Sequence, residues 1–295
     1  MMRLVVLVQL SLLLASCSSG AERRGAMPVT TPAGSSAPAP KDSAGDLRVA
    51  TALAALTTRP ACLVVRWPDG SERRSSQPAC AERRLPASTF KLPNALIGAE
   101  LGLLDSAEAI LPYDAQRYPA QPDWPQGWAQ PQPLRAALEI SAVPLFRGLA
   151  VRIGAARMRR YLDLLAYGNA TFSDDLDHFW LDGKLAISAD EQVAFLARLA
   201  AGTLPVSARA HAIVRAAMPA ETQGDATMRW KTGTARAATG WIAWLVGWIE
   251  RPEGTYPFAC RIDDERADMS LVRADRLRAC RGALAALGLM PAPAQ

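Results

Sequence analysis

Histidine and lysine are scarce in this sequence of 295 residues, which contains two histidines and four lysines beside 29 arginines. The histidines, His178 and His211, have no neighbouring residues with the spacing of a metal site, so we expect no metal centre. A Ser-His-Asp triad would need one of these two histidines, and neither has a sequence context that supports such a role. The arginines give a net charge of +5 but form no cluster interleaved with aromatic side chains. We therefore expect no nucleic-acid-binding surface.

The N-terminal region has the pattern of an export signal followed by a tether. Residues 1–17 carry Arg3 near the start, then an apolar run that is too short to span a membrane, and end on Leu-Ala-Ser-Cys. This ending resembles a bacterial lipobox, which predicts cleavage after residue 16 and a lipid anchor on Cys17; the alternative is ordinary cleavage near Ala15. Residues 17–46 are rich in Ala, Pro, Ser and Gly and predict a tether. We expect a membrane-anchored lipoprotein in the periplasm of a Gram-negative bacterium.

Four cysteines remain besides the lipobox cysteine, an even number in a chain that we expect to be exported. Cys62 and Cys80 flank the turn signal Pro68-Asp69-Gly70, which favours a disulfide between them. Cys260 ends a strand-like run and Cys280 lies in a helical pattern near the C-terminus. The pairs 62 with 80 and 260 with 280 are thus favoured over the two other pairings, and four free thiols are the alternative.

Apolar residues recur at two different spacings along the chain. Helical periodicity dominates from Ser88 to Met218, where a capping box at residues 188–191 opens a helix that stops near Gly202. Strand-like runs lie at 61–67, 228–231, 241–249 and 256–262, and further helices are expected at 46–56 and 271–287. The pattern predicts an α/β (α+β) sandwich over residues 47–295. In it, an antiparallel sheet from both chain ends is flanked by helices, and an all-helical subdomain (about 88–224) is inserted.

Ser88 and Lys91 are three residues apart, a spacing that puts both side chains on one face of a helix. Lys231 begins the motif Lys231-Thr232-Gly233 in a strand-like run. Each motif alone is weak evidence for a site. Lysine, however, can lose its proton during a reaction and arginine cannot, and this sequence uses arginine almost everywhere else. We therefore infer a serine nucleophile that is activated by a lysine.

A Ser-x-x-Lys motif, a middle element beginning with Ser, and Lys-Thr-Gly are shared by serine β-lactamases and penicillin-binding proteins. The middle element here is Ser141-Ala142-Val143, with valine where a polar residue is expected. Over about residues 46–290 the chain resembles class D (oxacillinase-type) β-lactamases, which implies the β-lactamase/transpeptidase-like fold and hydrolysis of β-lactam antibiotics. The stretches that carry this resemblance, in that family's order, are LPASTFKLPN (85–94), SAVP (141–144), YGN (167–169), FWLDG (179–183), IS (187–188), EQV (191–193) with FL (195–196), and WLVGW (244–248).

The resemblance implies that Ser88 is acylated by the substrate and that Lys91 acts as general base after carbon dioxide has carboxylated its amine. No other cofactor is implied. A carbamate forms only from a neutral amine, so we expect burial beside apolar residues such as Val143 and Trp180 to lower the pKa of Lys91. The indole N–H of Trp180 would donate a hydrogen bond to the carbamate.

The remaining roles that the resemblance implies concern the β-lactam ring and its carboxylate. Ser141 would relay a proton toward the lactam nitrogen, and Lys231 would supply positive charge. Backbone N–H groups of the nucleophile and of Thr234 would form the oxyanion hole. Arg273 is expected to bind the substrate carboxylate, with Arg276 as the alternative.

Other residues near these motifs bear on substrate binding. Thr232 and Gly233 are expected on a strand edge that the substrate approaches, where glycine leaves room for it. Thr234 stands where the family often has a large residue, and Pro131-Gln132-Pro133 replaces a stretch that usually contains Asp. We expect both departures to affect the substrate range.

Two other functions share these motifs: a penicillin-binding D,D-peptidase and a β-lactam sensor domain that stays acylated. Tyr167-Gly168-Asn169 and Phe179-Trp180-Leu181 favour the hydrolase over the peptidase. A sensor would need spanning helices, and only the export signal is apolar enough to suggest one. The sequence does not choose among β-lactams, nor between a monomer and a homodimer.

Overall fold

The computed structural model describes residues 43–171, 175–181, 183–266 and 268–291. The predicted export signal and Cys17 lie outside the described residues, as does most of the predicted tether. Among the residues that the structure describes, no helix has the length and apolarity needed to cross a membrane.

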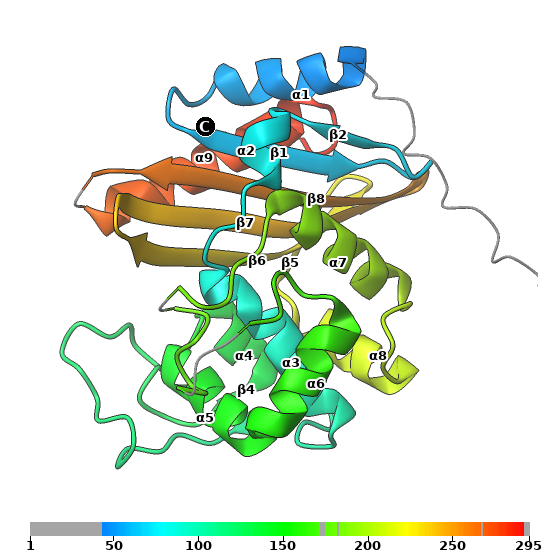
Figure 1. Ribbon diagram of the computed structural model, residues 1–295. Helices are drawn as coiled ribbons and strands as arrows, with labels where there is room; N and C mark the ends of the chain where they lie inside the picture. The colour runs from blue at the N-terminus through cyan, green and yellow to red at the C-terminus, as the bar shows by residue number, and fades with distance from the viewer. Residues whose placement is uncertain (1–42, 172–174, 182, 267, 292–295) are drawn as a thin grey trace, which may run out of the picture. The chain divides into compact units, whose positions relative to one another are not determined.

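A six-stranded antiparallel sheet combines strands from both ends of the domain, as predicted (Figure 1). Its order is β2-β1-β8-β7-β6-β5, so the N-terminal β1 lies beside the C-terminal β8. The strand bounds are β1 Ala61–Arg66, β2 Glu72–Arg74, β5 Ala220–Gln223, β6 Ala226–Ala237, β7 Gly240–Arg251 and β8 Gly254–Asp264. β5 pairs only with residues 226–229 of β6, and the rest of that edge of β6 faces the helical layer and the cleft described below.

Both predicted disulfides are present. Cys62 on β1 is bonded to Cys80, and Cys260 on β8 is bonded to Cys280. The turn between the first pair contains Gly70 at φ 86°, and β1 pairs with β2 beyond it. Cys80 itself lies in the short helix α2 (Gln77–Ala81).

Two helices from opposite ends of the domain pack together against the sheet (Figure 1). These are α1 (Ser43–Ala54), which begins three residues before the predicted start, and α9 (Met269–Ala286). Their buried side chains share one apolar cluster with β1, β7 and β8. Because Cys280 lies in α9, the second disulfide joins this helix to the sheet.

The helical layer forms the larger apolar cluster with the other side chains of the sheet. Its elements are the 3-10 helix η1 Ala87–Phe90 and the α-helices α3 Lys91–Glu100, α4 Leu134–Glu139, α5 Val143–Ile153, α6 Ala155–Leu165, α7 Ala189–Ala201 and α8 Ala208–Ala217. The predicted capping box is present at Ser188 and Glu191, and α7 ends at Gly202 in the left-handed conformation. One short ladder, β3 Ile110–Leu111 with β4 Gln132–Pro133, interrupts the otherwise helical layer.

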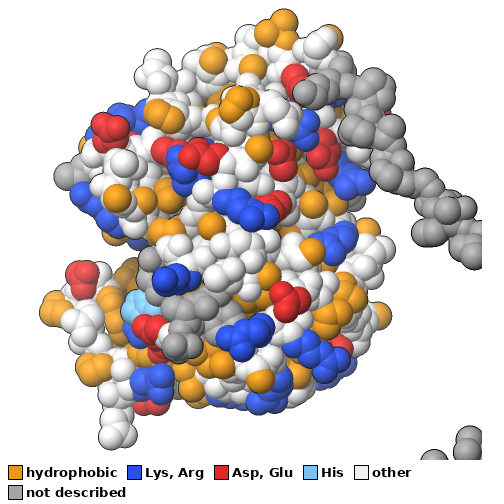
Figure 2. Space-filling view, in the orientation of Figure 1, with side chains coloured by type: hydrophobic (Ala, Val, Ile, Leu, Met, Phe, Trp, Pro, Cys, Tyr) orange, Lys and Arg blue, Asp and Glu red, His pale blue; other side chains and the backbone are white. Residues whose placement is uncertain are grey.

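Ion pairs join segments that are distant in the sequence. Arg74 on β2 contacts Asp190 on α7 at 3.0 Å, and Arg83 contacts Glu191 on the same helix. Figure 2 shows basic and acidic side chains next to one another over much of one face of the molecule. These pairs attach α7 to the part of the chain that leads from the sheet to Ser88.

Candidate active site

A cleft of about 250 Å³ lies between the helical layer, β6 and α9. It brings together six of the predicted site residues, namely Ser88, Ser141, Val143, Thr232, Thr234 and Arg273. The cleft is also lined by Pro125, Trp128, Glu139, Ile140, Leu181 and Arg276. Predicted residues Lys91, Trp180 and Lys231 are buried, and Gly233 is buried on β6.

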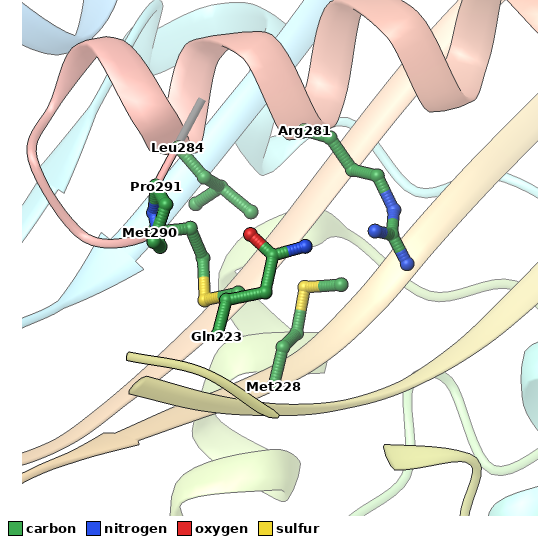
Figure 3. Close-up of a pocket in the computed structure, with 6 residues that line it drawn as sticks. All are labelled: Gln223, Met228, Arg281, Leu284, Met290 and Pro291. Carbon is green, nitrogen blue, oxygen red and sulfur yellow. The ribbon is translucent and has the colours of Figure 1, made fainter. Parts of the chain in front are cut away.

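A second hollow lies between α9 and the strands β5 and β6 (Figure 3). It is lined by apolar side chains such as Met228 and Leu284 together with Gln223 and Arg281, and its volume is about 10 Å³. That volume is about the size of one water molecule, and none of the predicted site residues lines it. We therefore assign the functional site to the cleft that Ser88 and the other predicted residues line.

The local backbone places Ser88 at a tight turn. Ala87 has φ 50°, in the left-handed region that residues other than glycine rarely adopt, and it begins the 3-10 turn η1. Thr89, which follows Ser88, donates its hydroxyl proton to the carbonyl of Pro86 at 2.7 Å and accepts a hydrogen bond from Gln192 at 2.8 Å. The turn is thus tied to α7, and Ser88, which is 9% exposed, opens into the cleft.

Lys91 lies at the start of α3, three residues after Ser88, as the spacing predicted. Its Nζ donates to Ser88 Oγ at 2.7 Å. The side chain is completely buried, and burial lowers the pKa of Lys91 to about 7. Among the described residues no carboxylate forms an ion pair with this amine, and the ring centroid of Phe146 lies 5.6 Å from it. Lys91 can therefore exist as a neutral amine beside the nucleophile at neutral pH.

Trp180 belongs to an aromatic cluster that borders the Lys91 region. Its ring stacks on Phe90 with centroids 5.0 Å apart, and Phe179 contacts both rings edge-on. Trp180 is fully buried, yet its Nε1 has no hydrogen-bond partner among the described residues. Buried indole N–H groups usually have an acceptor, so this donor is available to a further group.

Ser141 and Lys231 form the second polar pair of the cleft. Lys231 Nζ donates to Ser141 Oγ at 3.0 Å and to the carbonyl of Thr232 at 2.9 Å. Ser141 has φ 56° and follows the end of α4, and α5 begins two residues later at Val143. Burial is the main reason that the pKa of Lys231 is well below its ordinary value, and the charges of Lys91 and Arg276 lower it further.

Gly233 has a packing role that the sequence did not indicate. A Cβ atom at this position would lie 2.9 Å from the carbonyl oxygen of Pro86 and 3.2 Å from the backbone nitrogen of Thr89. The space that glycine leaves is therefore occupied by η1. Glycine at this position allows the turn that carries Ser88 to pack closely against β6.

Two arginines of α9 line the same cleft. Arg273, the residue preferred from the sequence, is exposed, whereas Arg276 is 5% exposed. Arg276 donates to the Thr234 hydroxyl at 2.9 Å, and burial lowers its pKa to about 10. No carboxylate pairs with Arg276 in the part of the chain that the structure describes. The structure thus brings both candidates to the site and places the alternative one deeper.

Sequence reasoning missed the apolar wall of the cleft. Pro125 and Trp128 lie in the long segment between β3 and β4, and the indole of Trp128 donates to the carbonyl of Ile140 at 2.9 Å. Leu181, from the FWLDG stretch, completes this wall. The only signal in the sequence was the pair of tryptophans in a proline-rich segment, which has no periodicity and so does not indicate where the segment packs.

The chain is similar to known proteins across most of this domain. Residues 57–279 match the family model described as penicillin binding protein transpeptidase domain. The chain is 39% identical to Beta-lactamase OXA-5 of Pseudomonas aeruginosa over 61% of this chain and 66% of that protein, slightly less than two thirds of its length. It is also 39% identical to Beta-lactamase OXA-48 of Klebsiella pneumoniae over 62% of this chain and 68% of that protein.

A solved structure of a class D β-lactamase is also similar to this chain. The crystal structure of the class D β-lactamase YbXI from Nostoc matches with a TM-score of 0.74 and 32% identity, over 82% of this chain and 99% of that chain. Residues 57–279, which match the family model, contain the strands of the sheet and the residues that line the cleft. The fold, the paired serine and lysine, and these similarities together show that the chain belongs to the class D β-lactamase family, within the transpeptidase-domain family.

Proposed function

We propose that this protein hydrolyses β-lactam antibiotics through an acyl-enzyme on Ser88. The observation that carries the proposal is the contact of 2.7 Å between Lys91 Nζ and Ser88 Oγ, made by an amine whose pKa burial lowers to about 7. A neutral amine can react with carbon dioxide, and the carbamate so formed beside Ser88 would accept the serine proton while the hydroxyl oxygen attacks. Exposed lysines are protonated at neutral pH and lack this capacity.

Acylation requires proton transfer at both ends of the lactam bond. Ser88 Oγ bonds to the carbonyl carbon, the C–N bond of the ring breaks, and the ring nitrogen takes a proton from Ser141. Lys231, 3.0 Å from Ser141 Oγ, is placed to replace that proton. We assign the oxyanion hole to the backbone N–H groups of Ser88 and Thr234, which would hold the carbonyl oxygen as it becomes negative. In the second step water adds a hydroxyl to the acyl carbon, the ester bond to Ser88 Oγ breaks, and the water proton passes by way of Lys91 to Ser88. Proton exchange with water then returns to Lys231 the proton that it lost and removes the one that Lys91 gained.

We further propose that Lys91 is N-carboxylated in the active enzyme. Two features fit that group: the buried amine, which can be neutral as reaction with carbon dioxide requires, and the unpaired N–H of buried Trp180. When present, the carboxylate supplies a base that remains unprotonated near neutral pH. The apolar side chains around Lys91 exclude water from the amine and so oppose its protonation.

The substrate carboxylate is proposed to bind at the cationic side of the cleft. Thr232 and Thr234 offer hydroxyl groups there, and Arg276 supports Thr234 through its hydrogen bond of 2.9 Å. Arg273 on the rim adds a second positive charge. The wall of the cleft around Trp128 is apolar, so it suits the acyl side chain of the antibiotic.

We also propose the cellular location that the sequence predicts, namely a periplasmic lipoprotein anchored through Cys17. A diacylated or triacylated cysteine has enough buried methylene groups for stable anchoring. Mass spectrometry of the protein purified from membranes should detect lipid on an N-terminal Cys17. An unmodified Cys17 would refute the anchor.

Steady-state hydrolysis of a penicillin, an oxacillin and a carbapenem by residues 47–295 tests the proposed function. Turnover of at least one of them, lost in Ser88→Ala, is the expected result. A stable acyl adduct on Ser88 without turnover would instead identify a penicillin-binding peptidase or a sensor. Sedimentation of the same sample distinguishes a monomer from a homodimer.

A further inference from the structure

Asp177 is a buried carboxylate near the active site that the proposed mechanism does not use. Its side chain is 4% exposed and precedes Trp180 by three residues. It accepts hydrogen bonds from the phenol of Tyr118, from Arg147 Nη2 at 3.1 Å and from Arg117 Nε at 3.4 Å. Burial would raise the pKa of Asp177, but the hydrogen bonds from Tyr118 and Arg147 outweigh burial and lower it. The carboxylate is therefore a charged centre with three donors.

These donors come from two other segments of the chain. Arg147 lies in α5, and its guanidinium carbon is 4.5 Å from the ring centroid of Tyr118. Arg117 also donates to the Tyr118 hydroxyl at 3.0 Å. Asp177 thus binds residues 175–181 both to α5 and to the segment that leads into the apolar wall of the cleft.

Helix α5 and residues 175–181, which Asp177 joins, both contribute to the surroundings of Lys91. The helix that carries Arg147 also carries Val143, which lines the cleft, and Phe146, whose ring centroid is 5.6 Å from the Lys91 amine. Residues 175–181 carry Trp180, which stacks on Phe90, the residue next to Lys91. A substitution at Asp177 would therefore alter the packing of residues 175–181 against α5 beside Lys91.

We propose that Asp177 is a positioning residue, which clamps residues 175–181 to Arg147 and Tyr118 and thereby holds Trp180 against Phe90. Asp177 contributes no atom to the reaction. It keeps the Lys91 pocket closed to water and the Trp180 N–H in place, and so favours carboxylation of Lys91. This inference rests on the proposed function, because it concerns the same lysine.

A metal ion does not explain the cluster better. Asp175 and His178 lie close enough to share an ion with Asp177, with ligand atoms within 4.8 Å of one another. The Asp177 carboxylate, however, is already paired with two guanidinium groups and a phenol. We therefore assign no metal here.

The test compares Asp177→Asn with a matched control, Glu250→Gln. Glu250 is also a carboxylate with two arginine partners and an indole donor: Arg215 at 2.8 Å, Arg229 at 3.2 Å and Trp248 Nε1 at 2.7 Å. It lies opposite Thr227 on β6, at the end of the ladder away from Thr234. Both substitutions remove one charge from an arginine cluster, but only Asp177 touches the segment that carries Trp180.

The readout is the carbamate signal in ¹³C NMR spectra during titration of each protein with ¹³C-bicarbonate at pH 7. We expect the half-saturating bicarbonate concentration to rise about tenfold in Asp177→Asn and to change less than about twofold in Glu250→Gln. If Asp177→Asn does not fold, Tyr118→Phe replaces it, since this change removes only the phenol donor. There we expect a rise of about threefold.

The outcomes separate the two proposals. A titration of Asp177→Asn, or of its substitute, that matches the unsubstituted protein overturns the positioning role and leaves the proposed function intact. An equal rise in Glu250→Gln also overturns it, because the effect would then be one of general stability. Absence of a carbamate signal in the unsubstituted protein refutes carboxylation of Lys91 and this inference together, while β-lactam hydrolysis is measured separately.

Discussion

The surroundings of Lys91 in the helical layer differ from those of Lys231 on β6, although both side chains are almost completely inaccessible to solvent. Among the described residues the Lys91 amine makes one hydrogen bond, to Ser88, beside the ring of Phe146, and burial alone lowers its pKa. Lys231 donates to two oxygens, and neighbouring positive charges add to the effect of burial. An apolar pocket leaves an amine free to change its chemical state. A polar pocket holds an amine in one arrangement, which suits a group that binds and orients.

Removal of the Lys91 amine should give the largest effect. Lys91→Ala removes the group that takes the Ser88 proton, and loss of a general base typically costs roughly 100- to 10,000-fold in the step it serves. We expect a decrease of that size in kcat/KM for a penicillin. The exposed Lys184 supplies the control, since Lys184→Ala should leave the rate unchanged. A Lys91→Ala enzyme within about tenfold of the unsubstituted rate would show that the base lies elsewhere.

The polar side of the cleft predicts a smaller effect, on substrate binding. Arg276→Met removes a buried cation that supports Thr234, and a hydrogen bond to a charged group contributes about 1.5–3 kcal/mol, so we expect KM to rise at least about tenfold. Arg273→Met should raise KM only about threefold, because water and salt screen an exposed charge. Arg278→Met, an exposed position on the same helix, is the control. A larger rise in KM for Arg273→Met than for Arg276→Met would contradict the proposal that Arg276 is the more important arginine for binding the substrate carboxylate.

The pH dependence of kcat/KM, measured with and without bicarbonate, should reveal the titration of Lys91 as a change of a few fold. The pKa of Lys91 is about 7, so its amine gains a proton as the pH falls through 7 and can then neither accept the serine proton nor react with carbon dioxide. In degassed buffer we expect kcat/KM to fall below pH 7, and added bicarbonate at pH 7 should raise it about threefold. If bicarbonate has no effect at pH 6 to 7, Lys91 acts as a free amine.

Local patterns in the sequence predicted the regular parts of the structure and the serine–lysine pair. The capping box at Ser188, the strand on each side of Gly233 and the spacing of Ser88 and Lys91 each depend on residues near in sequence. Both disulfides followed from one turn and from the small number of cysteines. The regular spacing of side chains along a strand or helix makes such features readable without tertiary information.

Other parts of the site depend on contacts between distant segments and could not be predicted. Arg273 and Arg276 are one helical turn apart, and only the packing of α9 against β6 decides which of them reaches Thr234. The clamp on Asp177 joins residues 60 positions apart, and no periodic pattern connects them. The left-handed backbone at Ala87 and Ser141 likewise has no sequence signal, because neither residue type favours it.

The most direct test asks whether removal of the acyl group from Ser88 depends on the Lys91 pocket. The Trp180→Ala protein is mixed with a penicillin, with and without excess bicarbonate, and its mass is followed over time. The substitution removes an unpaired indole N–H and opens the pocket to water, so Lys91 should return to the protonated form. We predict slower acylation followed by a persistent adduct of the penicillin mass, which bicarbonate partly relieves, whereas the unsubstituted protein shows no lasting adduct. Turnover at a near-normal rate without an adduct would make Trp180 a packing residue only and would contradict the account.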